Sequence, residues 1–235
     1  SPERLAIKGL GQFQRFEAAS QLRSLIENWH VSDFHIAQAR NVVDAGHAEH
    51  LSPSGDNLPL VAQHIYERHP TVFAQILETL KRRVPGVSNV EATETVDGRV
   101  VLRFQDGSFQ DPFISRFVSD GTIKMFAYLL LLYDPKPLQL LCVEEPENQL
   151  YVQLLQELAE EFHSYARRGG QVFVTTHSPD FLDAVPLASI FVVRKRDGFS
   201  AVEHPADSET LRALAEAGDP PGALWRQGLL DAGLA

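Results

Sequence analysis

Two apolar segments of this sequence each end in residues that could activate water. Leu140–Val143 runs directly into Glu144 and Glu145, and a later apolar segment ends in His177. Adjacent residues at a strand end point in different directions, so one carboxylate can hold a metal ion while the other orients or deprotonates water. A histidine beside them can hydrogen-bond a phosphate or the attacking water. The three residues together predict a metal-assisted attack by water.

A second set of candidates is Ser119, Asp120 and Gly121, immediately before a segment with the apolar spacing of a helix. The backbone N–H groups at a helix start, together with a serine hydroxyl, can bind an anion. The same residue types also form ordinary helix N-caps, and taken alone these three favour the cap. His177 taken alone favours a structural role, so the prediction of a site depends on the combination.

The elements that position these residues are predicted from hydrophobic periodicity. Residues 16–83 are mainly helical, and strand-like runs with Asp-Gly turns lie within 88–111. An apolar helix, a strand ending at Glu144, an amphipathic helix over 151–168, a strand ending near His177 and a third strand over 189–196 follow. This alternation predicts an α/β fold with parallel neighbouring strands, and ligands bind such sheets at the carboxyl ends of the strands. Since the strands show no polar alternation, we expect a sheet covered on both faces.

Composition limits the classes of partner. The chain has 31 acidic and 21 basic residues and a formal net charge of -10, so any nucleic-acid contact would have to be local. One cysteine, Cys142, allows no internal disulfide, which favours a reducing, cytoplasmic location. The longest apolar run, Met125–Tyr133, is far shorter than the roughly 20 residues of a membrane span, and no membrane partner is expected.

The order of these motifs carries a family resemblance. The sequence SDGT, an apolar helix, EEPEN and TTHSPD, best covered over 114–196, resembles the C-terminal part of an ABC-type ATPase of the RecF/SMC-like group of AAA-family ATPases. The resemblance implies an α/β P-loop NTPase fold of ABC type, whose C-terminal lobe with a parallel sheet spans 111–235. Residues 1–110 would form a helical insertion subdomain with a short β segment.

Residue roles follow from the resemblance alone. Val118–Thr122 stands at the signature motif, Leu140–Glu144 at the Walker B strand and Pro146–Tyr151 at the D-loop. Glu144 would be the metal ligand, Glu145 the catalytic base and His177 the switch histidine, while Ser119, Asp120, Gly121 and Asn148 would bind nucleotide. The implied cofactors are ATP and Mg²⁺.

The sequence departs from the transporter-type pattern. Asp120 replaces the first signature glycine, no signature Gln is present, and Glu144 stands where transporters favour Asp, which favours the RecF-like branch. Gln149-Leu150-Tyr151 replaces the Gly-Leu-His of many relatives. No G-x-x-x-x-G-K-[ST] motif occurs, so we expect the P-loop upstream of Ser1 and little ATP binding or activity by this chain alone.

The function implied is an ATP-binding and ATP-hydrolysing switch that works as a head-to-tail homodimer. Relatives act in DNA repair, chromosome maintenance or phage defence, so DNA and a nuclease are further expected partners. Two alternatives stay open. Metal-dependent DNA cleavage without nucleotide would favour a hydrolase or nuclease built on Glu144, Glu145 and His177. Activity that is insensitive to Glu145→Gln would favour a non-catalytic module that binds a nuclease or DNA.

Overall fold

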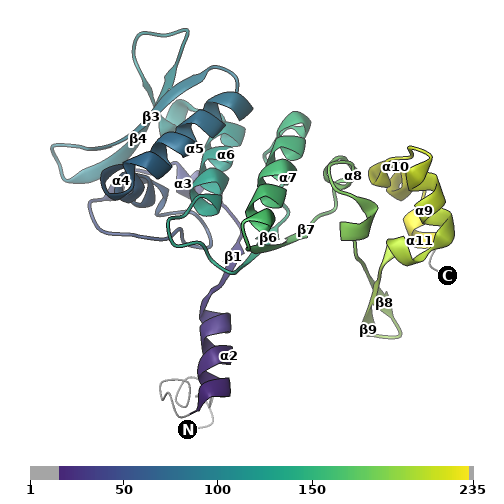
Figure 1. The fold of residues 1–235 in the computed structure, drawn as a ribbon. Helices are drawn as coiled ribbons and strands as arrows, with labels where there is room; N and C mark the ends of the chain where they lie inside the picture. Colours follow the sequence, from purple (N-terminus) through teal and green to yellow (C-terminus); the bar gives the residue numbers. More distant parts are fainter. Residues whose placement is uncertain (1–15, 233–235) are drawn as a thin grey trace.

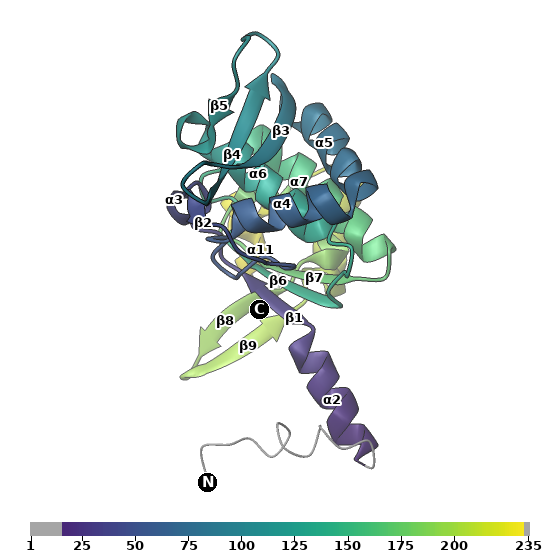
Figure 2. The same ribbon diagram turned by 90° about the vertical axis from the view of Figure 1, so that its left-hand side faces the viewer.

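The computed structural model describes residues 16–232, and Figures 1 and 2 show two views of them. In chain order, the first elements are α2 (Glu17–Glu27), β1 (Trp29–Ser32), α3 (Ile36–Ala39), β2 (Val43–Asp44), α4 (Leu58–Arg68), α5 (Pro70–Arg83), β3 (Val87–Glu94), β4 (Arg99–Asp106), β5 (Phe113–Ile114) and the 3-10 helix η1 (Ser115–Phe117). They are followed by α6 (Asp120–Leu132), β6 (Leu140–Glu144), α7 (Val152–Arg167), β7 (Gln171–Thr175), α8 (Pro179–Leu182), η2 (Leu187–Ser189), β8 (Val192–Arg196), β9 (Phe199–Glu203), η3 (Pro205–Asp207), α9 (Glu209–Glu216), α10 (Pro221–Arg226) and α11 (Leu229–Ala232).

The central sheet is parallel and has the strand order β1-β6-β7. Its register places Ser32 beside Val143, and Val143 beside Val174. Side chains at these positions face α6 and α7, which pack together on one face of the sheet (Figures 1 and 2). The predicted strands that end at Glu144 and near His177 are therefore present and parallel.

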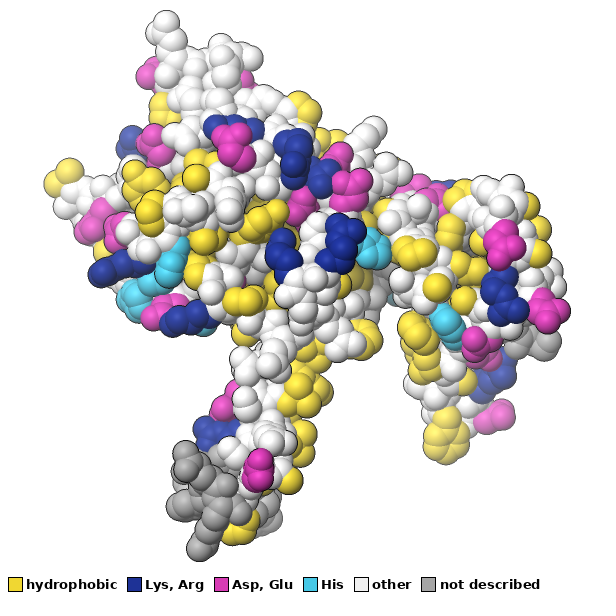
Figure 3. Space-filling model, viewed as in Figure 1, with side chains coloured by type: hydrophobic (Ala, Val, Ile, Leu, Met, Phe, Trp, Pro, Cys, Tyr) yellow, Lys and Arg dark blue, Asp and Glu magenta, His cyan; other side chains and the backbone are white. Residues whose placement is uncertain are grey.

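The expectation that this sheet is covered on both faces is wrong for the described residues. Trp29 is 49% exposed and Phe173 is 53% exposed, and both lie on the face away from α6 and α7. Strand side chains alternate between faces, so helices on one side bury only every second residue. Figure 3 shows apolar side chains continuing along α2, where Leu22, Leu25 and Ile26 are exposed.

Helix α6 lies at the centre of the main core. Every residue from Gly121 to Leu132 is buried, which explains why most of them are apolar and the helix is not amphipathic. On one side α6 meets α7, and on the other it meets α4, α5 and the antiparallel sheet β2-β4-β3. The Phe126 ring packs edge-on against Phe104 and Phe73, with centroid separations of 5.6 and 6.5 Å.

The turn between β3 and β4 matches its prediction. Gly98 has φ 74°, a conformation that glycine adopts without a Cβ penalty, and it follows Asp97 in the predicted Asp-Gly turn. The division of the chain into subdomains at residue 110 stays a prediction. Strand β1 lies before that boundary and pairs with β6, which lies after it.

The third predicted strand does not join the parallel sheet. It forms β8, which pairs antiparallel with β9 in a separate two-stranded sheet. The Asp197-Gly198 turn joins β8 to β9, and both turn residues have positive φ, the geometry of a tight hairpin. The helical tail packs around a second small core made by Leu187, Leu211, Leu224 and Leu230. Among the described residues, no helix combines the length and the apolar character needed to cross a membrane.

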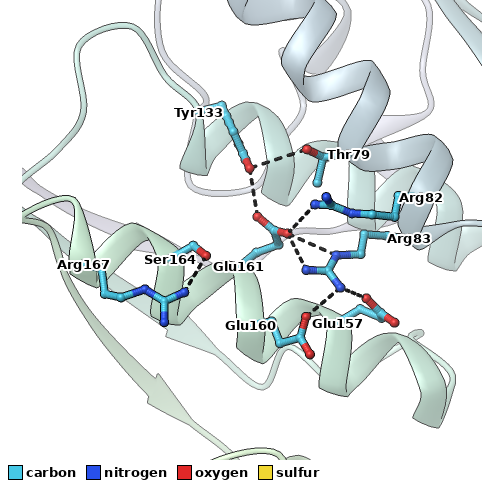
Figure 4. Close-up of polar contacts among 9 residues, drawn as sticks. All are labelled: Thr79, Arg82, Arg83, Tyr133, Glu157, Glu160, Glu161, Ser164 and Arg167. Atoms are coloured by element: carbon cyan, nitrogen blue, oxygen red, sulfur yellow. Dashed lines mark hydrogen bonds and ion pairs between the residues drawn. The ribbon is translucent and has the colours of Figure 1, made fainter.

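A buried polar cluster joins α5 to α7 (Figure 4). The Glu161 carboxylate accepts hydrogen bonds from Arg83 Nε and Nη2, at 3.1 and 2.9 Å, and from the Tyr133 hydroxyl at 3.1 Å. Arg83 also pairs with Glu157 and Glu160. Burial by itself would lower the pKa of Arg83, but these carboxylates together raise the pKa above its usual value. Arg83 therefore keeps its positive charge between the two helices, where three carboxylates surround it.

Candidate functional site

The carboxyl ends of β6 and β7 lie side by side. Glu144 is in register with Thr175, and the Glu145 N–H donates to the Thr175 carbonyl oxygen at 2.9 Å. Since the strands are parallel neighbours, the residues that follow them emerge at the same edge of the sheet. The structure thus brings together Glu144, Glu145 and His177, the three residues that the sequence singled out.

Glu145 adopts an uncommon backbone conformation. Its φ is 38°, in the left-handed region that non-glycine residues seldom occupy. The turn is closed by the Asn148 N–H, which donates to the Glu145 carbonyl oxygen at 3.0 Å. The Asn148 side chain amide also donates to Glu145 Oε2 at 2.9 Å. Residues held in sparsely populated conformations concentrate at functional sites. Here the strained backbone and the Asn148 amide together fix the orientation of the Glu145 carboxylate.

His177 lies beside the other oxygen of this carboxylate. Its Nε2 atom is 3.8 Å from Glu145 Oε1, and the ring is largely exposed to solvent. The backbone around it is held by Glu147, whose Oε1 accepts from the His177 N–H at 2.9 Å and from the Thr176 hydroxyl at 2.7 Å. Glu147 therefore locks the end of β7 to the loop after β6. Sequence reasoning assigned Glu147 no such role, although its place as the third carboxylate of EEPEN was a signal.

The Ser119–Gly121 segment forms the N-terminus of α6. Ser119 is the N-cap, and its hydroxyl accepts from the Thr122 N–H at 3.2 Å. Asp120 is paired with Arg40, whose guanidinium also donates to the Arg116 carbonyl oxygen at 3.3 Å. This ion pair places a cation at the helix end that favours anions. Arg40 was missed because nothing near it in the sequence indicates a site.

The loop after β6 packs directly against the first turn of α6. A Cβ atom on Gly121 would lie 3.7 Å from the Gln149 carbonyl oxygen and 3.6 Å from the Tyr151 ring. Gln149 has φ 65°, so this loop contains a second left-handed residue. The loop that follows β6 therefore carries Glu145, contacts the N-terminus of α6 and, through Glu147, holds the backbone of His177.

Glu144 fits the role of a magnesium ligand. It is exposed at the end of β6, so its carboxylate is accessible. Within residues 16–232, no group of three or more His, Cys, Asp or Glu side chains could hold a metal ion. Magnesium in nucleotide sites is commonly bound by one or two carboxylates together with substrate phosphates, so Glu144 would serve with a phosphate as a further ligand.

No curated protein matches the sequence. Among solved structures, an Smc head domain with an extended coiled coil, bound to the C-terminal domain of ScpA and derived from Pyrococcus furiosus, is 14% identical with a TM-score of 0.50. The match covers 90% of this chain and 50% of that one. An SmcHead bound to the C-winged helix domain of ScpA is 15% identical with a TM-score of 0.50, and the match covers 75% of this chain and 54% of that one.

These matches confirm the predicted fold class. The described residues have the α/β fold of a P-loop NTPase and resemble an SMC head, with a parallel sheet and packed helices. The chain spans about half the length of the two solved chains. Residues 7–183 match a protein family described as "AAA domain, putative AbiEii toxin, Type IV TA system". The chain therefore belongs to this family of AAA-domain ATPases.

Proposed function

We propose that this chain carries the hydrolytic and partner-facing part of an ATP-driven dimer switch of the RecF/SMC-like type. The observation that supports it best is the Glu145 carboxylate, which lies between His177 Nε2 and the Asn148 amide at the carboxyl edge of a parallel sheet. A catalytic base needs one oxygen free to take a proton and a fixed orientation. Asn148 orients one oxygen of Glu145, and the other faces His177.

In the proposed reaction, Glu145 orients and deprotonates the water that attacks the γ-phosphate, and His177 donates a hydrogen bond to the γ-phosphate. Glu144 would hold Mg²⁺, which supplies charge neutralisation when bound. The reaction would also need a P-loop, a motif that these 235 residues do not contain. The N-terminus of α6, with Ser119, Asp120 and Gly121, would face the nucleotide of a second copy across a twofold axis.

The biological setting is part of the proposal. The family description names an AbiEii toxin and a Type IV toxin–antitoxin system, which supports phage defence as the process served by the switch. DNA and a nuclease are the partners proposed from the RecF/SMC-like resemblance. The nuclease alternative built on Glu144, Glu145 and His177 has no metal-binding group of three side chains within residues 16–232 to support it.

The test measures the ATP hydrolysis rate of the full-length protein and follows its dimerisation by light scattering. We expect Glu145→Gln to lower the hydrolysis rate by about 10²–10⁴-fold, the usual contribution of a general base, and to accumulate an ATP-bound dimer. Glu209→Gln, on the exposed helix α9, is the matched control and should hydrolyse ATP at the wild-type rate. Equal rates for wild type and Glu145→Gln would refute the assignment and favour the non-catalytic module.

A further inference from the structure

Helix α6 carries a lysine in its first two turns that is almost completely buried. Lys124 is only 2% exposed, and its Nζ atom donates to the Asn148 carbonyl oxygen at 2.6 Å. The ammonium also lies 5.9 Å from the centroid of the buried Tyr128 ring. Burying a charge is costly unless it is paired or hydrogen-bonded. The hydrogen bond to Asn148 therefore offsets part of the cost of burying the Lys124 ammonium.

The charges around Lys124 come from the site itself. Burial lowers the pKa of Lys124 to about 8, while the carboxylates of Asp33, Glu147 and Glu145 partly offset this effect. The ammonium form therefore still prevails at neutral pH. These acids follow β1 and β6, so Lys124 lies beneath the carboxyl edge of the sheet.

Lys124 is linked to Glu145, the proposed catalytic base, through a single residue, Asn148. Asn148, whose carbonyl oxygen accepts from Lys124, holds Glu145 through both its backbone N–H and its side chain amide. The loop between them contains two left-handed residues, Glu145 and Gln149. Such strained positions persist only when surrounding groups over-determine them, and Lys124 supplies that constraint from α6.

We propose that Lys124 is a positioning residue that couples the N-terminal turns of α6 to the orientation of the Glu145 carboxylate. The inference deepens the proposed function and rests on it, because it assigns Glu145 the catalytic part. A nucleotide bound against Ser119–Gly121 would then bias the loop that holds Glu145, through one helix and one hydrogen bond. If Lys124 served only to stabilise the fold, its substitution would instead accelerate hydrogen exchange equally throughout the core.

Hydrogen exchange of the full-length protein tests this coupling without any need for ATP. In Lys124→Met, whose unbranched side chain fits the same apolar space, we expect the Asn148 and Leu150 amides to exchange at least about tenfold faster, because a charge-assisted hydrogen bond is lost. Exchange in β3 and β4 should stay at the wild-type rate. Lys124→Arg, which keeps the cation, and the exposed Lys195→Met control should both resemble wild type.

Two results would overturn the proposal. One is an unchanged exchange rate at Asn148 and Leu150 in Lys124→Met, and the other is acceleration spread evenly over the chain, which indicates lost stability only. In the ATPase assay, Lys124→Met should lower kcat about tenfold and leave KM for ATP unchanged, because Lys124 touches no nucleotide. A wild-type protein without ATPase activity would refute the proposed function, while the exchange result would still decide the role of Lys124.

Discussion

Removing Arg83 should destabilise the fold far more than removing its neighbour Arg82. Glu161 is 3% exposed, and Arg83, at 14% exposed, is its main cationic partner. Arg82 is 65% exposed, and its nearest nitrogen lies 3.7 Å from Glu161 Oε1. Arg83→Met therefore leaves a buried carboxylate with the Tyr133 hydroxyl and a distant, solvent-screened cation.

The expected size of the effect follows from this burial. Breaking a buried ion pair by removing one partner typically costs about 3–5 kcal/mol, and we take the lower end, about 3 kcal/mol, because Tyr133 still donates to Glu161. For a chain of this length, that loss lowers Tm by about 6–12 °C. An exposed pair contributes about 0–1 kcal/mol, so Arg82→Met should shift Tm by at most a few degrees.

Urea unfolding at neutral pH measures the free energies of the variants. A double variant, Arg83→Met with Glu161→Met, removes both charges and should recover most of the lost stability, because apolar replacements of a buried pair are often neutral. The reasoning is refuted if Arg83→Met costs no more than Arg82→Met. It is also refuted if the double variant is less stable than Arg83→Met alone.

Three further predictions concern other parts of the chain. Arg40→Met leaves the Asp120 carboxylate unpaired at the N-terminus of α6, where it would repel the phosphates of a nucleotide. The affinity of ATP-driven dimerisation, measured by light scattering, should therefore fall about tenfold. The folded-state pKa of Lys124, about 8, lies below its unfolded value, so the unfolded state binds more protons between these values and stability should rise with pH. The urea-derived free energy of unfolding should increase by about 2 kcal/mol from about pH 7.5 to about pH 9.5, and Lys124→Met should lose that increase. Gly170→Ala should lower stability by about 1–3 kcal/mol in the same assay, because its Cβ would lie 2.1 Å from the Tyr165 ring.

Each of these has a contrary outcome. Dimerisation of Arg40→Met at the wild-type ATP concentration would show that the Asp120 charge does not face a nucleotide. An equal pH dependence in wild type and Lys124→Met would place the titrating group elsewhere. A Gly170→Ala variant as stable as wild type would show that the Tyr165 ring does not restrict a side chain at this position.

The elements with strong local signals were predictable from the sequence. The Asp97-Gly98 turn, the apolar helix α6 and the strands before Glu144 and His177 all appear in the structure. Strand β1 was not predicted, because its four residues, WHVS, lack a recognisable pattern and gain their place only by pairing with β6. Strand β8 was assigned to the wrong sheet because a short apolar strand does not specify its neighbour, and here a tight turn directs it to β9.

The candidate site, like the fold, was predictable only in part. The sequence by itself determined that Glu144, Glu145 and His177 share one edge, because residues that follow parallel neighbouring strands must emerge together. Only the tertiary structure decided what holds them: Lys124 contacts Asn148 across 24 residues, Glu147 contacts His177 across 30, and Arg40 contacts Asp120 across 80. Motif spacing describes groups on one strand or loop. Hydrogen bonds and ion pairs between distant segments depend on how helices pack over the sheet, and that packing is a property of the whole core.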